Sequence, residues 1–201
     1  MSSERDGAGR VIAGTARGVR LAAPGEMTRP LSDRVKQTLF AILEPALRGA
    51  TILDLFAGSG AGGIEGLSRG AACALFVEHD RTAVATITEN LVRAHVAGPN
   101  ARVLQREAIT WLRSPDALAH GPIAVALVDP PYDKPELLQS ALELLGVETS
   151  PMAQGATVVA KHFWRDQPAD RIGLLASDRT RRFGDTALTF YRMASTTEAQ
   201  P

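Results

Sequence analysis

Cysteine is almost absent from this sequence, since Cys73 is the single cysteine among 201 residues. One thiol cannot form a disulfide framework, and its place in an apolar run favours a small buried side chain in a reducing cytosol. No apolar run approaches the ~20 residues of a membrane span. The amino-terminal MSSERDGAGR also lacks the apolar region of a secretory signal. We therefore expect a cytoplasmic protein without a membrane partner, made of one domain or of one domain with a small appendage.

Net charge is also absent, because 22 basic and 22 acidic side chains cancel. This balance argues against a simple polybasic protein, but the charges are unevenly distributed. Residues 1–36 carry a net +3, residues 37–160 a net −5 and residues 161–192 a net +3. Such asymmetry permits an RNA or DNA partner held by the two ends, although charge scatter of this size also arises by chance.

The stretch 51–63, TILDLFAGSGAGG, organises the rest of the chain. It begins as a short apolar run interrupted by Asp54, which is typical of a strand buried in a sheet. A turn rich in glycine follows, and then a helix with Ile64 and Leu67 on its buried side. Glycine lets the backbone approach a ligand, and a helix N-terminus offers unpaired N–H groups. The unit therefore predicts a nucleotide-cofactor site.

Strand and helix patterns alternate along the remaining chain. Ser32 and Asp80 are expected to cap helices, and Pro45 with Gly49 to end the first of these. Further strands are predicted at 74–77, 102–104, 123–128 and 156–160, with a closing pair within 181–193 around a turn at 184–185. This order predicts an α/β fold: a Rossmann-like, doubly wound, mostly parallel seven-stranded sheet with an antiparallel C-terminal strand.

A small β-hairpin is predicted ahead of this sheet, in residues 10–21, RVIAGTARGVRL. It carries Arg10, Arg17 and Arg20. Two interpretations of these arginines are about equally supported: a solvated surface hairpin, or an arm that binds the phosphates of a nucleic acid.

The glycine turn leaves two cofactor classes open. Gly58, Gly60 and Gly63 match G-x-G-x-x-G, and Glu78 follows where a dinucleotide-binding protein keeps its ribose carboxylate. NAD is therefore the competing cofactor. Asp54 opposes it, because a carboxylate inside the strand suits a positively charged ligand and no phosphate needs it. A P-loop is excluded, since no Lys-Ser/Thr pair follows the glycines.

Asp129-Pro130-Pro131-Tyr132, after the predicted strand 123–128, is the most specific signal. Two prolines fix the backbone and remove two N–H donors, so the turn presents only acceptors beside the flat face of Tyr132. Acceptors next to an aromatic face suit an aromatic amine, whose two N–H bonds the carboxylate and the Pro130 carbonyl can hold. An ordinary strand-ending turn is the alternative, and the carboxyl end of a parallel strand argues against it.

These motifs resemble those of a known enzyme class. Phe56-Ala57-Gly58-Ser59-Gly60 with Asp129-Pro130-Pro131-Tyr132 looks like an S-adenosylmethionine-dependent amino-methyltransferase. The runs RVIAGTARGVRL, RPLSDRVKQTLFAIL and DLFAGSGAGGIEGLSRGA narrow the resemblance to the bacterial 16S rRNA (guanine-N2)-methyltransferases, from about Arg10 to Met193. It implies methyl transfer from S-adenosylmethionine to the exocyclic N2 of a guanine in 16S rRNA, either free or in the assembling small ribosomal subunit.

The resemblance also implies roles for individual residues. Asp54, with the turn around it, would line the methionine part of the cofactor, Glu78 would hold the ribose, and Glu107 would accept from the adenine amine. The implied cofactor-binding residues are Arg29, Ser32, Asp54, Phe56, Ala57, Gly58, Ser59, Gly60, Glu78, His79, Glu107 and Ala108. Asp129, Pro130, Pro131 and Tyr132 would hold the guanine, and no metal is implied. We expect a monomer with a tail and basic arm (1–28), a methyltransferase domain (29–195) and a disordered tail (196–201).

The chain departs from the family pattern at 161–164, KHFW, where members usually carry an acid before a polar pair. His162 is a candidate base there, although a surface loop histidine is the favoured interpretation. Three other functions stay open. An adenine-N6 methyltransferase of DNA or RNA shares the Asp-Pro-Pro-Tyr chemistry, an NAD-dependent dehydrogenase shares the glycine turn, and a non-catalytic RNA-binding module would not need the acceptor turn.

Overall fold

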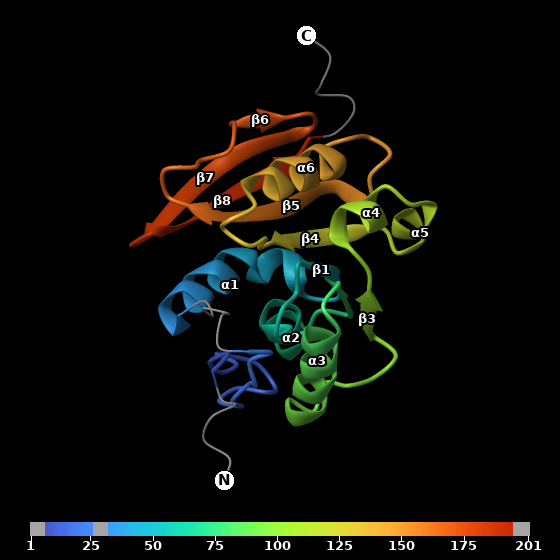
Figure 1. Ribbon diagram of the computed structural model, residues 1–201, viewed down its shortest axis with the longest axis vertical. Helices are drawn as coiled ribbons and strands as arrows, with labels where there is room; N and C mark the ends of the chain where they lie inside the picture. Colours follow the sequence, from blue (N-terminus) through green and yellow to red (C-terminus); the bar gives the residue numbers. More distant parts are fainter. Residues whose placement is uncertain (1–6, 26–31, 195–201) are drawn as a thin grey trace.

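The structure is a computed structural model, and it describes residues 7–25 and 32–194. Its centre is one eight-stranded sheet with the order β3-β2-β1-β4-β5-β8-β7-β6 (Figure 1). The strands are β1 (Thr51–Leu55), β2 (Cys73–Glu78), β3 (Ala101–Gln105), β4 (Ile123–Val128), β5 (Met152–Phe163), β6 (Arg171–Ile172), β7 (Leu175–Phe183) and β8 (Thr186–Met193). The first five strands pair in parallel, whereas β8 is antiparallel to both β5 and β7.

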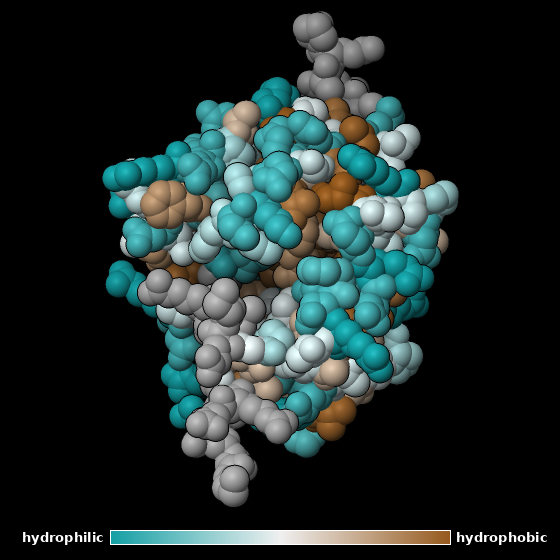
Figure 2. All heavy atoms as spheres, viewed as in Figure 1, coloured by the Kyte–Doolittle hydropathy of each residue, from teal (hydrophilic) through white to brown (hydrophobic). Residues whose placement is uncertain are grey.

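Helices cover both faces of this sheet. They are α1 (Asp33–Leu47), α2 (Ala61–Ser68), α3 (Arg81–Arg93), α4 (Ala108–Leu112), α5 (Pro115–Ala119) and α6 (Pro135–Leu145). Successive strand residues serve opposite cores: Ile52 and Phe76 pack in the cluster of α1, α2 and α3, and Leu53 and Val77 in that of α4, α5 and α6. Strands buried on both faces explain the near-continuous apolar runs of the sequence. Hydrophilic side chains dominate the face seen in Figure 2.

The predicted helix starts are confirmed. Ser32 caps α1 by accepting a hydrogen bond from Val35 N (3.4 Å), and Asp80 caps α3 through Ala83 N (2.8 Å). The sequence pattern predicted that Pro45 would end α1, but the helix continues past it to Leu47. Leu47 is fully buried, and its packing against the core holds the last turn in place.

The predicted fold class is confirmed, with eight strands instead of seven. The additional strand β6 has two residues, too few to produce a periodic sequence pattern. β5 and β7 are longer than predicted, since β5 begins at Met152 and continues through Lys161 and His162 to Phe163, and β7 begins at Leu175. The predicted turn at 184–185 joins β7 to β8.

The predicted amino-terminal β-hairpin is not confirmed. Within the described part of this segment, one isolated bridge joins Arg10 and Arg20, and no regular strand pair forms. The reason is that side chains of α2 bind the backbone there. The buried Glu65 carboxylate accepts hydrogen bonds from Ile12 N (2.7 Å) and Ala13 N (3.1 Å). Val11 and other apolar residues of the segment join the hydrophobic core, so the segment packs against the sheet domain.

Glu65→Ala is therefore expected to destabilise the protein strongly. It leaves two backbone N–H groups without their acceptor, and a buried polar group left unsatisfied costs about 1–3 kcal/mol. It also removes the Glu65 partner of the Arg69 guanidinium (2.7 Å), a largely buried side chain. Thermal melting measures the loss, and amide hydrogen exchange should show faster exchange at residues 12 and 13.

Glu89→Ala is the matched control, because Glu89 makes an exposed i,i+4 pair with Arg93 on α3. Such pairs contribute roughly 0.3–0.5 kcal/mol. Equal melting temperatures for the two variants would show that Glu65 does not secure the amino-terminal segment.

Candidate active site

Two loops meet where β1 and β4 end, because these strands are direct neighbours. The register pairs Leu55 with Val128, and Asp129 N donates to Leu55 O at 3.4 Å. The strand order reverses here, since β2 lies on one side of β1 and β4 on the other. In open α/β sheets this switch point leaves a crevice at the carboxyl ends of the strands, where ligands bind. The glycine turn and the Asp-Pro-Pro-Tyr turn therefore border one site.

The glycine turn combines an open side with a closely packed side. Gly58 and Gly60 have φ values of 54° and 75°, and Phe56 is also positive, at 63°. Positive φ in a bulky residue is strained, and such residues cluster at ligand sites. A Cβ on Gly58 would meet no atom within 4 Å, whereas one on Gly63 would lie 2.3 Å from the Phe76 ring. Glycine thus leaves open space at 58 and lets α2 pack against β2 at 63.

Asn90 on α3 supports the turn, and the sequence did not reveal this role. Its fully buried amide donates from Nδ2 to Ser59 O and to Ala22 O, both at 2.9 Å, while Oδ1 accepts from Ala22 N at 2.8 Å. One side chain therefore joins the glycine turn to the amino-terminal segment. An asparagine within a helical pattern has no distinctive sequence signal.

Asp54 is a buried carboxylate beneath the site. Its Oδ2 accepts a hydrogen bond from Gly63 N at 2.8 Å, in the first turn of α2. Burial raises the pKa of Asp54 from 3.8 to about 7, and the negative charges of Asp129 and Glu78 add to the rise. The hydrogen bond from Gly63 opposes these effects only in part. A cation bound nearby would favour the ionised form.

Glu78 also lies buried at the strand ends, and backbone donors surround it. Oε2 accepts from Gly58 N (2.8 Å), and Oε1 accepts from His79 N (2.8 Å) and Asp80 N (2.9 Å). The exposed His79 ring places Nδ1 3.1 Å from the same carboxylate. Glu78 therefore links the end of β2 to the glycine turn after β1.

Lys161, at the end of β5, pairs with Asp129. Its Nζ lies 2.7 Å from Oδ1 and 2.9 Å from Oδ2, and 5.1 Å from the centre of the Tyr132 ring. Burial lowers the pKa of Lys161, but the charge of Asp129 and the hydrogen bond to it together outweigh burial, so the pKa lies above its ordinary value. The Tyr132 hydroxyl bonds to Thr186 Oγ1 at 3.0 Å, which fixes the half-exposed ring. The sequence pattern did not indicate that Lys161 pairs with Asp129.

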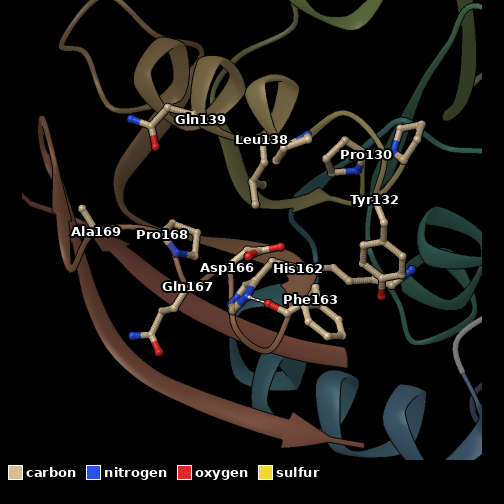
Figure 3. A pocket seen from close by; sticks show the side chains of 13 residues that line it. Pro130, Tyr132, Leu138, Gln139, His162, Phe163, Asp166, Gln167, Pro168 and Ala169 are labelled. Carbon is tan, nitrogen blue, oxygen red and sulfur yellow. Dashed lines mark hydrogen bonds between the residues drawn. The ribbon is translucent and has the colours of Figure 1, made fainter. Parts of the chain in front are cut away.

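A cavity of about 310 Å³ lies beside the Asp-Pro-Pro-Tyr turn (Figure 3). It lies between this turn, α6, the end of β5 and the segment 166–169, and Leu138 points into it from α6. A volume of this size is at the lower end of the range for small-molecule sites. The lining residues are Pro130, Pro131, Tyr132, Pro135, Leu138, Gln139, Lys161, His162, Phe163, Asp166, Gln167, Pro168 and Ala169.

His162 is not a surface loop histidine, as its sequence position suggested, but a buried residue of β5. The strand extends past its apolar part and carries the imidazole into the sheet. Nδ1 lies 2.8 Å from Phe163 O, which can only accept, and Nε2 lies 2.9 Å from Thr189 Oγ1. Burial lowers the pKa of the imidazole. Both ring nitrogens are engaged, which argues against a role as base.

Of the remaining predicted cofactor residues, Glu107 and Ala108 follow the carboxyl end of β3, and Arg29 lies outside the described residues. Glu107 follows β3 and caps α4, accepting from Ile109 N (3.0 Å) and Thr110 N (2.7 Å). Partial burial raises its pKa, but these hydrogen bonds outweigh burial and the pKa is lowered. Ala108 is the buried first residue of α4.

The three arginines predicted to bind RNA are all exposed. Arg10 pairs with Asp33 at 2.8 Å, which compensates its charge locally. No ion pair involves Arg17 or Arg20 within the described segments. RNA binding by these two residues stays a prediction.

The sequence from 9 to 192 matches the protein family described as "Conserved hypothetical protein 95". The chain belongs to this family. It is 34% identical over 184 residues to "Putative rRNA methyltransferase YlbH" of Bacillus subtilis, which covers 91% of this chain and 98% of that protein. It is 41% identical over 137 residues to "Ribosomal RNA small subunit methyltransferase D" of Escherichia coli, covering 68% of this chain and 66% of that protein. The resemblance to an rRNA methyltransferase family is confirmed.

Solved structures share the fold. "Putative methyltransferase yhhF from Escherichia coli" aligns with a TM-score of 0.80 and 32% identity over 92% of this chain and 97% of that one. The structure described as "SMU.776, a putative methyltransferase complexed with SAH" aligns with a TM-score of 0.61 and 12% identity over 78% of this chain and 49% of that one. The second likeness is one of fold alone.

Asp54→Asn is expected to raise the melting temperature above neutral pH. The pKa of Asp54 is raised on folding, so the unfolded chain loses this proton at about pH 4 while the folded protein keeps it to about pH 7. Stability contributed at this position is therefore highest at low pH and falls as the pH rises between these two values. Asparagine keeps an oxygen for Gly63 N but carries no charge to desolvate.

Melting curves at about pH 8 and about pH 5 test this. The asparagine variant should exceed wild type by several degrees at the higher pH and by much less at the lower pH. Asp133→Asn, an exposed aspartate in the loop after β4, is the control and should change neither value. A difference for Asp54→Asn that does not depend on pH would show that Asp54 folds in its ionised form.

Proposed function

We propose that this chain transfers a methyl group from S-adenosylmethionine to the exocyclic N2 amine of a guanine in 16S rRNA. The direct pairing of β1 with β4 is the observation that supports this proposal most. It brings the glycine turn, which leaves open space at Gly58 above buried acids, next to the Asp-Pro-Pro-Tyr turn with its hydrogen-bond acceptors. The names of the relatives support ribosomal RNA of the small subunit as the substrate.

The residues at the glycine turn fit this cofactor, which supplies a methyl group activated on a positively charged sulfur. Asp54 would lie beside the cationic methionine part, Glu78 beside the ribose hydroxyls and Glu107 beside the adenine amine. Gly58 leaves the necessary space, since no atom lies within 4 Å of a Cβ there. The phosphates of NAD would instead approach the carboxylates of Asp54 and Asp129, and like charges repel in a partly buried site.

The substrate amine would be held by Asp129 and the Pro130 carbonyl. A carboxylate has about four lone-pair positions, so Asp129 can accept from Lys161 and from the amine together. Lys161 Nζ lies 2.7 Å from Oδ1 of Asp129, and a carboxylate paired in this way accepts hydrogen bonds and donates none. Holding both N–H bonds draws the nitrogen lone pair out of conjugation with the base and directs it at the methyl group.

The Tyr132 ring offers a flat surface for a base that has left its stack, with its hydroxyl fixed by Thr186. Positioning of the two reactants in line contributes up to about 7–11 kcal/mol in well-oriented reactions. The nitrogen loses its proton after alkylation, when it is acidic, so Asp129 or water suffices to accept it. This chemistry explains why His162 can be fully engaged in the sheet.

Product analysis tests the proposal directly. Purified protein is incubated with labelled S-adenosylmethionine and either naked 16S rRNA or assembled small subunits, and the nucleosides are separated by mass spectrometry. N2-methylguanosine is expected. Label in N6-methyladenosine would establish the adenine-N6 alternative, and calorimetric binding of NAD without binding of S-adenosylmethionine would overturn the methyltransferase assignment for this chain.

Asp129→Ala should abolish methyl transfer while sparing cofactor affinity. Loss of one preorganised acceptor lowers the rate by about 10²-fold or more. Calorimetry measures the cofactor and labelled transfer measures the rate, with Asp133→Ala as a control in the same loop. Because Asp129→Ala also leaves Lys161 unpaired, Asp129→Ala/Lys161→Met serves as a second variant for folding. A collapsed cofactor affinity with a near-normal rate would contradict the role of Asp129.

A further inference from the structure

Trp164 and two arginines form a compact cluster beside the proposed site. Trp164 follows the last residue of β5, and the guanidinium carbon of Arg182 on β7 lies 3.6 Å from the centre of its ring. The guanidinium carbon of Arg165 lies 4.8 Å from the same centre. We call Trp164, Arg165 and Arg182 the tryptophan–arginine cluster.

The cluster is held in place by backbone bonds. Trp164 N donates to Asp185 O at 3.0 Å, which fixes the end of β5 to the β7–β8 turn. Arg182 Nε donates to Gly184 O at 2.9 Å in that same turn. A guanidinium carries five N–H donors in a rigid fork, so Arg182 keeps its terminal nitrogens for another acceptor. Stacking and this hydrogen bond orient the fork before any ligand arrives.

The charges of Arg165 and Arg182 are available to a binding partner. Both are exposed, and among the described residues no carboxylate lies within ion-pair distance of Arg165 or Arg182. The nearby acids Asp166 and Asp185 therefore do not pair with them. Arg10, by contrast, is already paired with Asp33 in the amino-terminal segment.

Two contacts place the cluster next to the Asp-Pro-Pro-Tyr turn. Lys161, three residues before Trp164, pairs with Asp129, and Thr186, directly after the β7–β8 turn, bonds to Tyr132. A strand of RNA with one base at Tyr132 would continue past this edge. Residues 37–160 carry a net charge of −5, which repels the phosphates of an RNA strand. Cationic side chains beside the site are therefore needed to hold the strand.

We propose that the tryptophan–arginine cluster binds the RNA strand adjacent to the target nucleotide, with Arg165 and Arg182 contacting phosphates and Trp164 orienting them. This inference rests on the proposed function. It assigns RNA positioning to the carboxyl end of β5 and the β7–β8 turn. Phosphate contacts position a nucleic acid without reading its sequence, so the cluster contributes equally to target and unrelated RNA.

Filter binding across a salt series tests the cluster with Arg165→Gln/Arg182→Gln. Each lost single-strand phosphate contact should lower the magnitude of the log-affinity against log-salt slope by about 0.7, so the double variant should lose about 1.4. The affinity for target and scrambled RNA should fall alike. In the methylation assay the KM for RNA should rise while kcat stays near that of wild type.

Arg48→Gln/Arg113→Gln is the charge-matched control, since both arginines are exposed and follow α1 and α4. Its slope should equal that of wild type. Arg17→Gln/Arg20→Gln tests the amino-terminal segment in the same series. A normal slope and affinity in Arg165→Gln/Arg182→Gln would overturn the inference, and a loss confined to Arg17→Gln/Arg20→Gln would move the RNA surface to that segment.

Tryptophan emission gives an independent measurement, because Trp164 and the buried Trp111 are the two tryptophans of the chain. RNA should quench the emission of wild type and leave Trp164→Phe unquenched. Quenching that persists in Trp164→Phe would overturn RNA contact by the cluster. The same conclusion would follow if Arg165→Gln/Arg182→Gln weakened binding to assembled subunits but not to naked RNA. Calorimetry with S-adenosylmethionine is performed on wild type and on each variant. Absence of cofactor binding by wild type would refute the proposed function and would not by itself test RNA binding by the cluster.

Discussion

Carboxylate charge gathered at the carboxyl edge of the sheet is the constraint on which the site depends. Asp54, Glu78 and Asp129 belong to the neighbouring strand ends of β1, β2 and β4. Burial is the main cause that raises the pKa of Asp54, and the charges of Asp129 and Glu78 raise it further. Such charges persist only where donors compensate them. Gly63 N serves Asp54, three backbone N–H groups serve Glu78, and Lys161 serves Asp129. A site bordered by three carboxylates favours a cationic ligand.

The same requirement shapes the surrounding backbone. The glycine turn must aim N–H groups at two carboxylates and still leave space over Gly58, which explains the positive φ values at Phe56, Gly58 and Gly60. α2 and α3 then bind the amino-terminal segment through Glu65 and Asn90, and Asn90 also holds Ser59. A change in the amino-terminal segment can therefore reach the turn through a continuous chain of hydrogen bonds.

The end of β5 borders the Asp-Pro-Pro-Tyr turn, where we propose that the substrate binds. Lys161 lies in the part that departs from the family pattern, and it contacts both Asp129 and the Tyr132 ring. His162 is the next residue and is buried, with Nε2 2.9 Å from Thr189 Oγ1 on the neighbouring strand β8. Alternation along a strand thus sends neighbouring residues to different environments. The extended β5 therefore places Lys161 against Asp129 and holds His162 by Thr189 in a run that the sequence pattern suggested was a loop.

Local sequence determined the elements whose signal is local. The apolar run before Gly58 and the caps Ser32 and Asp80 predicted strand and helix starts correctly, because short-range sterics and hydrogen bonds decide them. The motifs around Gly58 and Asp129 also indicated the family. Only the tertiary structure decided the Lys161–Asp129 pair, the burial of His162 and the attachment of residues 12 and 13 to Glu65. Each joins positions more than 25 residues apart or depends on sheet register, and neither composition nor periodicity contains that information.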